Sequence, residues 1–303
     1  MVDPLPEMST EQSDPRFSQI DRLPTEQIAR LMNAADAAVP VAVAVAIPAI
    51  SAAIDAIANQ MAAGGRLLYV GAGTSGRLAV LDASECPPTF GTDPSLVQGI
   101  IAGGPDALTR SVEGAEDDAD AGAATMAELE VGPLDSVVGI SASGRAPFVL
   151  GAVTEAGRRG ALTVGLSCNS DSPLSAAAAH AIEVVVGAEV VTGSTRLKAG
   201  TAQKLVLNMI STISMVRLGR TYGNRMIEVS AMNSKLADRA ARMVGDITGA
   251  DLDTARKALD EAGGQAKVAV VMIQHGLDAG GARARLEEHG ERLGDALEKV
   301  NGT

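Results

Sequence analysis

Short apolar runs alternate with longer helical patterns through the middle of the chain. The apolar runs fall at 66–70, 96–102, 136–140, 162–166 and 183–186. Strands that are apolar at nearly every position are buried on both faces, which is typical of a parallel sheet covered by helices. The pattern therefore predicts an α/β fold.

Helical patterns without strands flank this predicted sheet. A short helix is expected after Pro24, with Thr25 as its cap, and an Ala/Val/Ile-rich helix is expected from 41 to 62. A long helix is expected from Lys198 to about Arg220, and short helices follow from about 235. Three hydroxyl residues before the long helix are candidates for its cap: Thr192, Ser194 and Thr195. The chain is therefore expected to form an N-terminal arm and helix (1–56), a sheet domain (57–220) and a helical C-terminal module (235–303).

The uncharged stretch 37–54 has borderline length for a membrane span. Most of it is Ala, and Pro40 and Pro48 interrupt it, so a buried or interface helix is the better interpretation. No signal peptide pattern precedes it. The two cysteines, Cys86 and Cys168, are expected to be reduced and buried, with a disulfide between them as the alternative. These features predict a cytoplasmic protein.

Charge and aromatic content narrow the classes of partner. The 303 residues carry 25 basic and 37 acidic side chains, a net charge of −12, and only 2% are aromatic. An acidic chain repels nucleic-acid phosphates and anionic membranes, and few rings are present on which bases or sugars stack. Nucleic acid and membrane are therefore not expected partners.

A glycine-rich loop follows the first predicted strand. Residues 71–76 read Gly-Ala-Gly-Thr-Ser-Gly, which satisfies the dinucleotide pattern, but the next strand lacks the acidic end that a ribose requires, since Asp106 lies beyond its turn. Arg77 replaces the P-loop lysine. Backbone N–H groups and hydroxyls at a helix start remain, and these suit a phosphate monoester. A similar loop at 138–145 adds Ser141 and Ser143 from a second strand end.

Several acidic side chains are candidates for acid/base chemistry. Glu85 precedes Pro87 and Pro88, which are expected to stop a helix and place it at a chain corner. Glu113 and Glu116 are spaced for one side of a helical turn, although a solvated acidic helix start gives the same pattern. The nearby Asp117, Asp118 and Asp120 are candidates for contact with a cation, and the alternative is a solvent-exposed acidic segment. The spacing of His180, His275 and His289 does not favour zinc.

Four blocks of sequence, 71–91, 112–118, 137–149 and 189–209, closely resemble N-acetylmuramic acid 6-phosphate etherases. These enzymes are members of the sugar isomerase (SIS) superfamily and are related to the glucokinase regulatory protein. The resemblance implies an SIS-type parallel sheet sandwiched by helices, a homodimer, a C-terminal module similar to a ubiquitin-associated domain, and no metal, nucleotide or other cofactor. The Pro-rich, acidic N-terminal extension departs from the family, and its first residues are expected to be disordered.

The etherases cleave the D-lactyl ether of N-acetylmuramic acid 6-phosphate to N-acetylglucosamine 6-phosphate and D-lactate. By the resemblance, Glu116 is the base at C2 of an open-chain aldehyde, Glu85 is the acid that assists lactate departure, and Glu113 is structural. The expected phosphate and substrate contacts are Gly73, Thr74, Ser75, Ser141 and Ser143 from the two loops, and Lys235 and Arg239 from the C-terminal module. For Lys235 and Arg239, a solvated helix face is the alternative.

Two other functions share these loops. A non-catalytic sugar-phosphate sensor needs the binding residues but not the pair Glu85 and Glu116, so retention of both favours an enzyme. An aldose–ketose phosphosugar isomerase also removes a C2 proton, but it returns the proton to C1 and releases nothing. Release of D-lactate separates the three.

Overall fold

The computed structural model describes residues 8–228 and 234–298, without the side chains of 234–236. The chain forms two compact units. The sheet unit comprises Met1–Ser84 and Pro94–Thr212, and the helical unit comprises Glu85–Asp93 and Ile213–Thr303. These two units are defined by contacts within the chain. The N-terminal arm (1–56), sheet domain (57–220) and C-terminal module (235–303) predicted from the sequence stay predictions.

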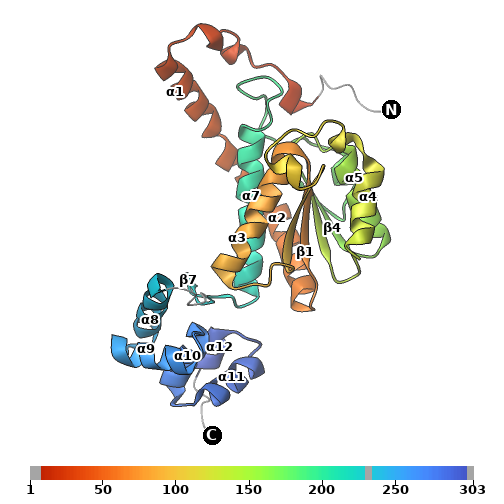
Figure 1. Cartoon of the computed structure of the whole chain (residues 1–303). Helices are drawn as coiled ribbons and strands as arrows, with labels where there is room; N and C mark the ends of the chain where they lie inside the picture. The colour runs from red at the N-terminus through yellow and green to blue at the C-terminus, as the bar shows by residue number, and fades with distance from the viewer. Residues whose placement is uncertain (1–7, 229–233, 299–303) are drawn as a thin grey trace. The chain divides into compact units, whose positions relative to one another are not determined.

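A five-stranded parallel sheet forms the centre of the sheet unit (Figure 1), which confirms the predicted fold class. The strand order is β2-β1-β3-β4-β5. The strands are β1 (Leu67–Gly71), β2 (Val97–Ile101), β3 (Ser136–Ile140), β4 (Leu162–Ser167) and β5 (His180–Glu183). Gly71 at the end of β1 pairs with Ile101 of β2 and Ile140 of β3, so these three strands end level with one another.

The last strand lies earlier in the sequence than predicted. The apolar run 183–186 suggested the strand, but pairing with β4 starts at His180 and ends at Glu183. Only Val184 extends the ladder, through its N–H to the Ser167 carbonyl at 2.9 Å. Backbone pairing, and not apolar character, sets the bounds of this edge strand.

Helices cover both faces of the sheet. On one face α5 (Pro147–Arg158) packs on β1, β3 and β4, with α4 (Ala119–Glu128) against it; on the other, α2 (Val39–Ala62) contacts β3, β4 and β5 (Figure 1). Alternate residues of β1 serve the two faces, and Leu68 and Val70 join the α5 core cluster. Two short elements complete this part of the unit: α6 (Pro173–Ala177) and the 3₁₀ helix η5 (Pro105–Leu108).

The expected helix at 41–62 is α2, and it follows α1 (Thr25–Asp36) closely. Thr25 was expected as the cap of α1, but it is the first helical residue; Pro24 occupies the cap position and offers no side-chain hydrogen bond. The run 25–62 is long and apolar enough to cross a membrane by length and composition alone. The second half of α2, however, buries Ile50, Ile54 and Ile57 almost completely, as a core helix does.

The N-terminal extension is ordered from residue 8 onward, which corrects the expected disorder for the described part; residues 1–7 lie outside it. Three short 3₁₀ helices form it: η2 (Ser9–Glu11), η3 (Pro15–Phe17) and η4 (Ile20–Arg22). Phe17 is buried in a small cluster with Ala35 and Val190. Apolar contacts far away in the sequence therefore hold a segment whose local composition is polar.

Helix α3 (Gly73–Phe90) contains Pro87 and Pro88, so the expected break before them was wrong. Both prolines lie in the last turn, where few helical hydrogen bonds remain to be lost. The Gly91 N–H still reaches the Pro87 carbonyl at 2.9 Å. Glu85 therefore lies on a helix and not at a chain corner.

Helix α7 (Lys198–Arg217) ends slightly before the expected Arg220. In the part of the chain that the structure describes, the first N–H groups of α7 bond to other acceptors and not to any of the three predicted hydroxyls. The buried carboxylate of Glu189 accepts hydrogen bonds from the backbone N–H groups of Lys198 at 3.0 Å and Ala199 at 2.9 Å. A carboxylate at this end is favoured because the first N–H groups are unpaired and carry partial positive charge.

The helical unit is built from short helices around its own apolar core, as the sequence pattern after 235 predicted. The core gathers Val244, Leu259, Val271, Leu286 and Leu293. The likeness to a ubiquitin-associated domain stays a prediction. The elements are the hairpin β6 (Thr221–Tyr222) and β7 (Arg225–Met226), then α8 (Ser234–Thr248), α9 (Leu252–Glu261), α10 (Ala266–His275), α11 (Ala279–Glu288) and α12 (Leu293–Leu297).

Candidate active site

A cavity of about 310 Å³ lies in the sheet unit where β1 and β3 end. In an open parallel sheet, ligands bind outside the carboxyl ends of the strands, and this cavity has that position. Its walls come from five separate stretches of chain and are rich in hydroxyls. The lining residues are Glu11, Ala72, Gly73, Thr74, Ser75, Glu116, Ile140, Ser141, Ala142, Ser143, Ala146 and Thr195.

The first wall is the glycine-rich loop predicted from the sequence. Helix α3 begins within it, at Gly73, so Thr74 and Ser75 occupy the first helical turn, where backbone N–H groups have no partner within the helix. Gly76 lets this turn pack closely on the sheet, because a Cβ there would lie 2.6 Å from Ile101 Cγ1. The result is a helix N-terminus that suits an anion.

The second wall is the loop between β3 and α5. The Ser141 N–H bonds to the Leu166 carbonyl at 3.1 Å, which ties the loop to β4. Ser141 Oγ accepts the Gly144 N–H at 3.1 Å and lies 3.3 Å from Ser143 Oγ. Because the ends of β1 and β3 are paired, the two hydroxyl-bearing loops are neighbours, as predicted.

Glu116 belongs to the short 3₁₀ helix η6 (Ala115–Asp117) and lines the same cavity. It is exposed overall, yet burial of its carboxyl raises its pKa above the usual value, and the charge of Asp117 raises the pKa further. The expected shared helical face with Glu113 is not formed, because Glu113 lies in the turn before η6. Only Glu116 of this pair lines the cavity.

No lysine or arginine is among the described residues that line this cavity. The arginine of the glycine-rich loop, Arg77, donates instead to the backbone carbonyls of Leu108 and Arg110, both at 3.0 Å. An anion in the cavity would therefore be held by hydroxyls, backbone N–H groups and the start of α3.

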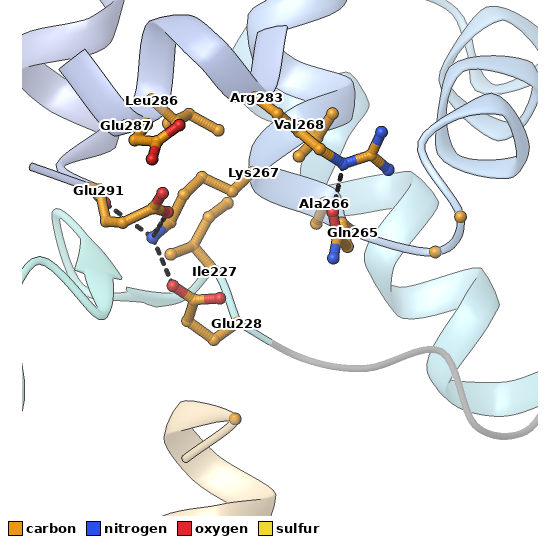
Figure 2. Close-up of a pocket in the computed structure, with 13 residues that line it drawn as sticks. Ile227, Glu228, Gln265, Ala266, Lys267, Val268, Arg283, Leu286, Glu287 and Glu291 are labelled. Atoms are coloured by element: carbon orange, nitrogen blue, oxygen red, sulfur yellow. Dashed lines mark hydrogen bonds and ion pairs between the residues drawn. The ribbon is translucent and has the colours of Figure 1, made fainter. Parts of the chain in front are cut away.

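A larger cavity, of about 510 Å³, lies within the helical unit and offers different chemistry (Figure 2). Its central cation is Lys267, which is buried, forms ion pairs with Glu228 and Glu291, and donates to the Glu291 carbonyl at 2.7 Å. The lining also contains Glu287 and Arg283. Three carboxylates against two cations give a net negative surface, which does not suit a phosphate.

Two other candidates, Glu85 and Arg239, are not among the described residues that line the hydroxyl-rich cavity. Glu85 is exposed on α3 and belongs to the helical unit. Arg239 is an exposed residue of α8 whose guanidinium lies 3.9 Å from Met226 Sδ. Lys235 is on the same helix, and its side chain lies outside the described residues. The structure thus gathers six of the nine predicted residues: Gly73, Thr74, Ser75, Glu116, Ser141 and Ser143.

The two cysteines and the possible metal ligands are the remaining reactive side chains. Cys86 and Cys168 are both buried thiols that are not in a disulfide, as expected, and burial raises the pKa of the Cys168 thiol to about 12. Within residues 8–228 and 234–298, no three His, Cys, Asp or Glu side chains are grouped to hold a metal ion.

Comparison with known proteins identifies the family. Residues 49–157 match the glucokinase regulatory protein N-terminal SIS domain, and residues 117–213 match the SIS domain. A solved phosphoheptose isomerase from Francisella tularensis shares the fold, with a TM-score of 0.52 and 22% identity, over 64% of this chain and 100% of that one. An N-acetylmuramic acid 6-phosphate etherase from Streptomyces avermitilis is 58% identical, over 96% of this chain and 93% of that protein.

The chain belongs to the N-acetylmuramic acid 6-phosphate etherase family. Etherases from Rubrobacter xylanophilus, at 57% identity over 94% of this chain and 95% of that protein, and Pectobacterium atrosepticum, at 51% over 95% of each, agree with this assignment. The family resemblance recognised in the sequence is confirmed. The SIS-type fold is confirmed as well, by the domain matches and the parallel sheet.

Sequence reasoning missed three residues in and around this etherase-family site. Glu11 and Thr195 line the cavity from segments distant in the sequence, and Thr195 had been considered only as a helix cap. Gln203 of α7 is buried behind the cavity, where its Oε1 accepts the Ser75 hydroxyl at 2.9 Å. Gln203 is a polar residue on an otherwise apolar helix face, and this pattern indicates that its side chain is buried. The pattern does not identify the side chain that Gln203 contacts.

Proposed function

We propose that this chain is a carbon–oxygen lyase that cleaves the D-lactyl ether of N-acetylmuramic acid 6-phosphate. The products are N-acetylglucosamine 6-phosphate and D-lactate. The observation that carries the proposal is the cavity at the ends of β1 and β3, in which the start of helix α3 and the carboxyl of Glu116 lie together in a member of the etherase family.

The phosphate is assigned to the two loops. Thr74, Ser141 and Ser143 supply hydroxyl donors. The Ser75 hydroxyl donates to Gln203, so Ser75 contributes through its backbone N–H in the first turn of α3, where Gly73 brings the backbone close. The partial positive charge of a helix N-terminus favours the anion without any fixed cation. With the phosphate held there, the sugar carbons extend into the same cavity toward Glu116.

The chemistry starts from the open-chain aldehyde, in which the C2 proton is acidic because it is next to a carbonyl. The Glu116 carboxylate takes that proton, and the C3–O bond then breaks with its electron pair leaving on the lactate oxygen. The resemblance to the etherases assigns the proton given to this oxygen to Glu85, which is not among the residues described as lining this cavity. Water then adds its oxygen to C3 and a proton returns to C2, so the balance is one water consumed for one lactate released.

The raised pKa of Glu116 fits the role of base. A carboxylate whose pKa is above its usual value is a stronger base, and catalytic efficiency increases as the pKa approaches the working pH. Positioning next to C2 supplies the rest of the rate advantage.

One assay tests the function as a whole. Purified protein is incubated with N-acetylmuramic acid 6-phosphate, and free D-lactate is measured. An etherase releases it, whereas a sugar-phosphate sensor leaves the substrate intact and an isomerase changes the sugar without losing lactate. Failure to release D-lactate contradicts the proposal.

The pH dependence follows from the raised pKa of Glu116. The ionised carboxylate is the active base, so activity falls as pH drops through this pKa. We expect the acidic limb of kcat/KM to lie above the ordinary glutamate value of about 4.3. Asp117→Asn removes the repelling charge and is expected to move the limb to lower pH. An acidic limb at or below the ordinary glutamate value in the wild-type protein contradicts Glu116 as the titrating group.

Replacing Glu85 by Gln removes the proposed proton donor but leaves the base. D-lactate release is expected to fall about 10²-fold, because a positioned proton-transfer group contributes about 10² to 10⁴ in rate. Exchange of the C2 hydrogen for solvent deuterium, followed by NMR, is expected to continue. Loss of exchange together with release would assign Glu85 to the first step instead.

We also propose a cytoplasmic homodimer. The support is the first half of α2, where the apolar side chains of Val41, Val45 and Ile47 are 67%, 80% and 46% exposed. Apolar faces of this kind are buried by a partner in many oligomers. Because the net charge of −12 repels anionic surfaces, nucleic acid and anionic membranes are not among the proposed partners.

A further inference from the structure

The N-terminal segment 8–11 is fixed to the sheet unit by a buried polar junction. Thr10 is 0% exposed, and its Oγ1 accepts a hydrogen bond from Asn169 Nδ2 at 3.0 Å. Asn169 Oδ1 in turn accepts the Ser9 hydroxyl at 2.9 Å. A buried side-chain amide with this many partners holds the backbone in one place.

The same asparagine also holds the serine loop of the cavity. Asn169 follows β4, and its Nδ2 donates to the carbonyl of Ala142 at 3.0 Å. Ala142 lies between Ser141 and Ser143, two of the expected phosphate contacts. One side chain therefore sets the position of the N-terminal segment relative to the site.

This junction brings Glu11 into the wall of the cavity. Its carboxylate lies beside Gly193, where an added Cβ would be 3.1 Å from Glu11 Oε2, and Gly193 has a φ of +74°. Thr195 lines the cavity from the same loop. Among the residues that the structure describes, the carboxylate of Glu11 has no ion pair or hydrogen-bond partner.

An ionised carboxylate only accepts hydrogen bonds, so it cannot help to hold a phosphate. Placed in the same cavity as a phosphate, it is favourable only where it meets donors. The hydroxyl and acetamido N–H groups of an amino sugar are such donors, and a carboxylate binds them with charge-assisted hydrogen bonds.

We propose that Glu11 is a substrate-binding residue that selects the sugar part of the ligand by accepting its O–H or N–H groups, and that segment 8–11 is a wall of the site. The inference rests on the proposed function for the identity of the sugar. Thr10 and Asn169 are positioning residues, since they act only through the segment that carries Glu11.

A pair of ligands separates this role from a structural one. Binding of N-acetylglucosamine 6-phosphate and of inorganic phosphate is measured by calorimetry. Glu11→Ala is expected to weaken binding of the sugar phosphate about 10- to 100-fold, the usual loss for a charge-assisted hydrogen bond. Binding of inorganic phosphate is expected to stay within about twofold, because phosphate does not need the carboxylate. The matched control is Glu26→Gln, an exposed glutamate of α1 outside the cavity, with no change for either ligand.

The junction is tested by Thr10→Val, which keeps the side-chain shape and removes the oxygen that Asn169 contacts. Weaker binding of the sugar phosphate is expected in this single variant, and no additional loss when it is combined with Glu11→Ala. Additive losses would show that Thr10 acts independently of Glu11 and would remove the positioning role.

In turnover, Glu11→Ala is expected to raise KM for N-acetylmuramic acid 6-phosphate while kcat changes little. Unchanged affinity for the sugar phosphate, or an equal loss for both ligands, overturns the inference. The calorimetric test does not depend on catalysis. A wild-type protein that binds the sugar phosphate but releases no D-lactate would refute the etherase function and leave the role of Glu11 to be decided by the ligand pair.

Discussion

Replacing Glu116 by Gln is expected to lower D-lactate release by about 10³- to 10⁴-fold, the upper range for loss of a positioned proton-transfer group. The amide keeps the size of the side chain but cannot accept the C2 proton. Exchange of the C2 hydrogen with deuterated water is expected to disappear as well, because it requires the same proton removal. Both are measured on one sample, by a lactate assay and by NMR.

The matched control is Glu113→Gln. Glu113 lies in the turn just before η6, is exposed and is not among the residues lining the cavity. Its replacement is expected to leave both measurements near the wild-type values. Continued C2 exchange in the Glu116 variant would reject Glu116 as the base, whatever happens to lactate release.

A large loss of stability is expected from Gly151→Ala, at the contact between α4 and α5. A Cβ at Gly151 would lie 2.0 Å from the carbonyl oxygen of Ala119, and this backbone atom cannot rotate away as a side chain can. The two helices must therefore move apart. Overpacking typically lowers the free energy of unfolding by 1–3 kcal/mol, and for a clash with a backbone atom we expect a loss at the upper end, about 3 kcal/mol. In a unit of this size we expect the melting temperature to fall by about 6–12 °C.

Gly157→Ala provides the control in the same helix. An added Cβ there would meet only Thr163 Cγ2, at 3.7 Å, which is an ordinary contact. Because alanine is the better helix former, this variant is expected to gain about 0.5–1 kcal/mol. Thermal melts followed by circular dichroism compare the two variants. Equal stability of both would mean that α4 and α5 do not approach as closely as described.

The parts of the site that could be predicted are those encoded locally. Gly73, Thr74 and Ser75 come just after the apolar strand β1. Ser141 and Ser143 come just after β3, which pairs with β1. In a parallel sheet, the ends of such strands meet at one edge, so strand runs and loop composition were enough to bring the two loops together.

Features that depend on contacts distant in the sequence could not be predicted. The cap of α7 is the clearest case: hydroxyls just before the helix gave the expected local signal, but the carboxylate of Glu189 takes that place. Glu11 reaches the cavity only because Asn169, far along the chain, holds its segment. No periodicity or motif records such a pairing.

Proline was misleading for a different reason. Pro87 and Pro88 do remove helical hydrogen bonds, but the cost depends on where in a helix they fall. In α3 they fall in the final turn, and the helix continues to Phe90. The position of a proline within the helix, and not the residue type alone, decides whether the helix ends.

A binding cavity lined by neutral donors has a consequence for the reaction itself. An ammonium or guanidinium group beside the substrate would attract the Glu116 carboxylate as well as the phosphate, and would make it a poorer proton acceptor. Among the described lining residues there is no such group to compete for it. Holding the anion through hydroxyls and peptide dipoles thus leaves the Glu116 carboxylate available to take a proton from carbon.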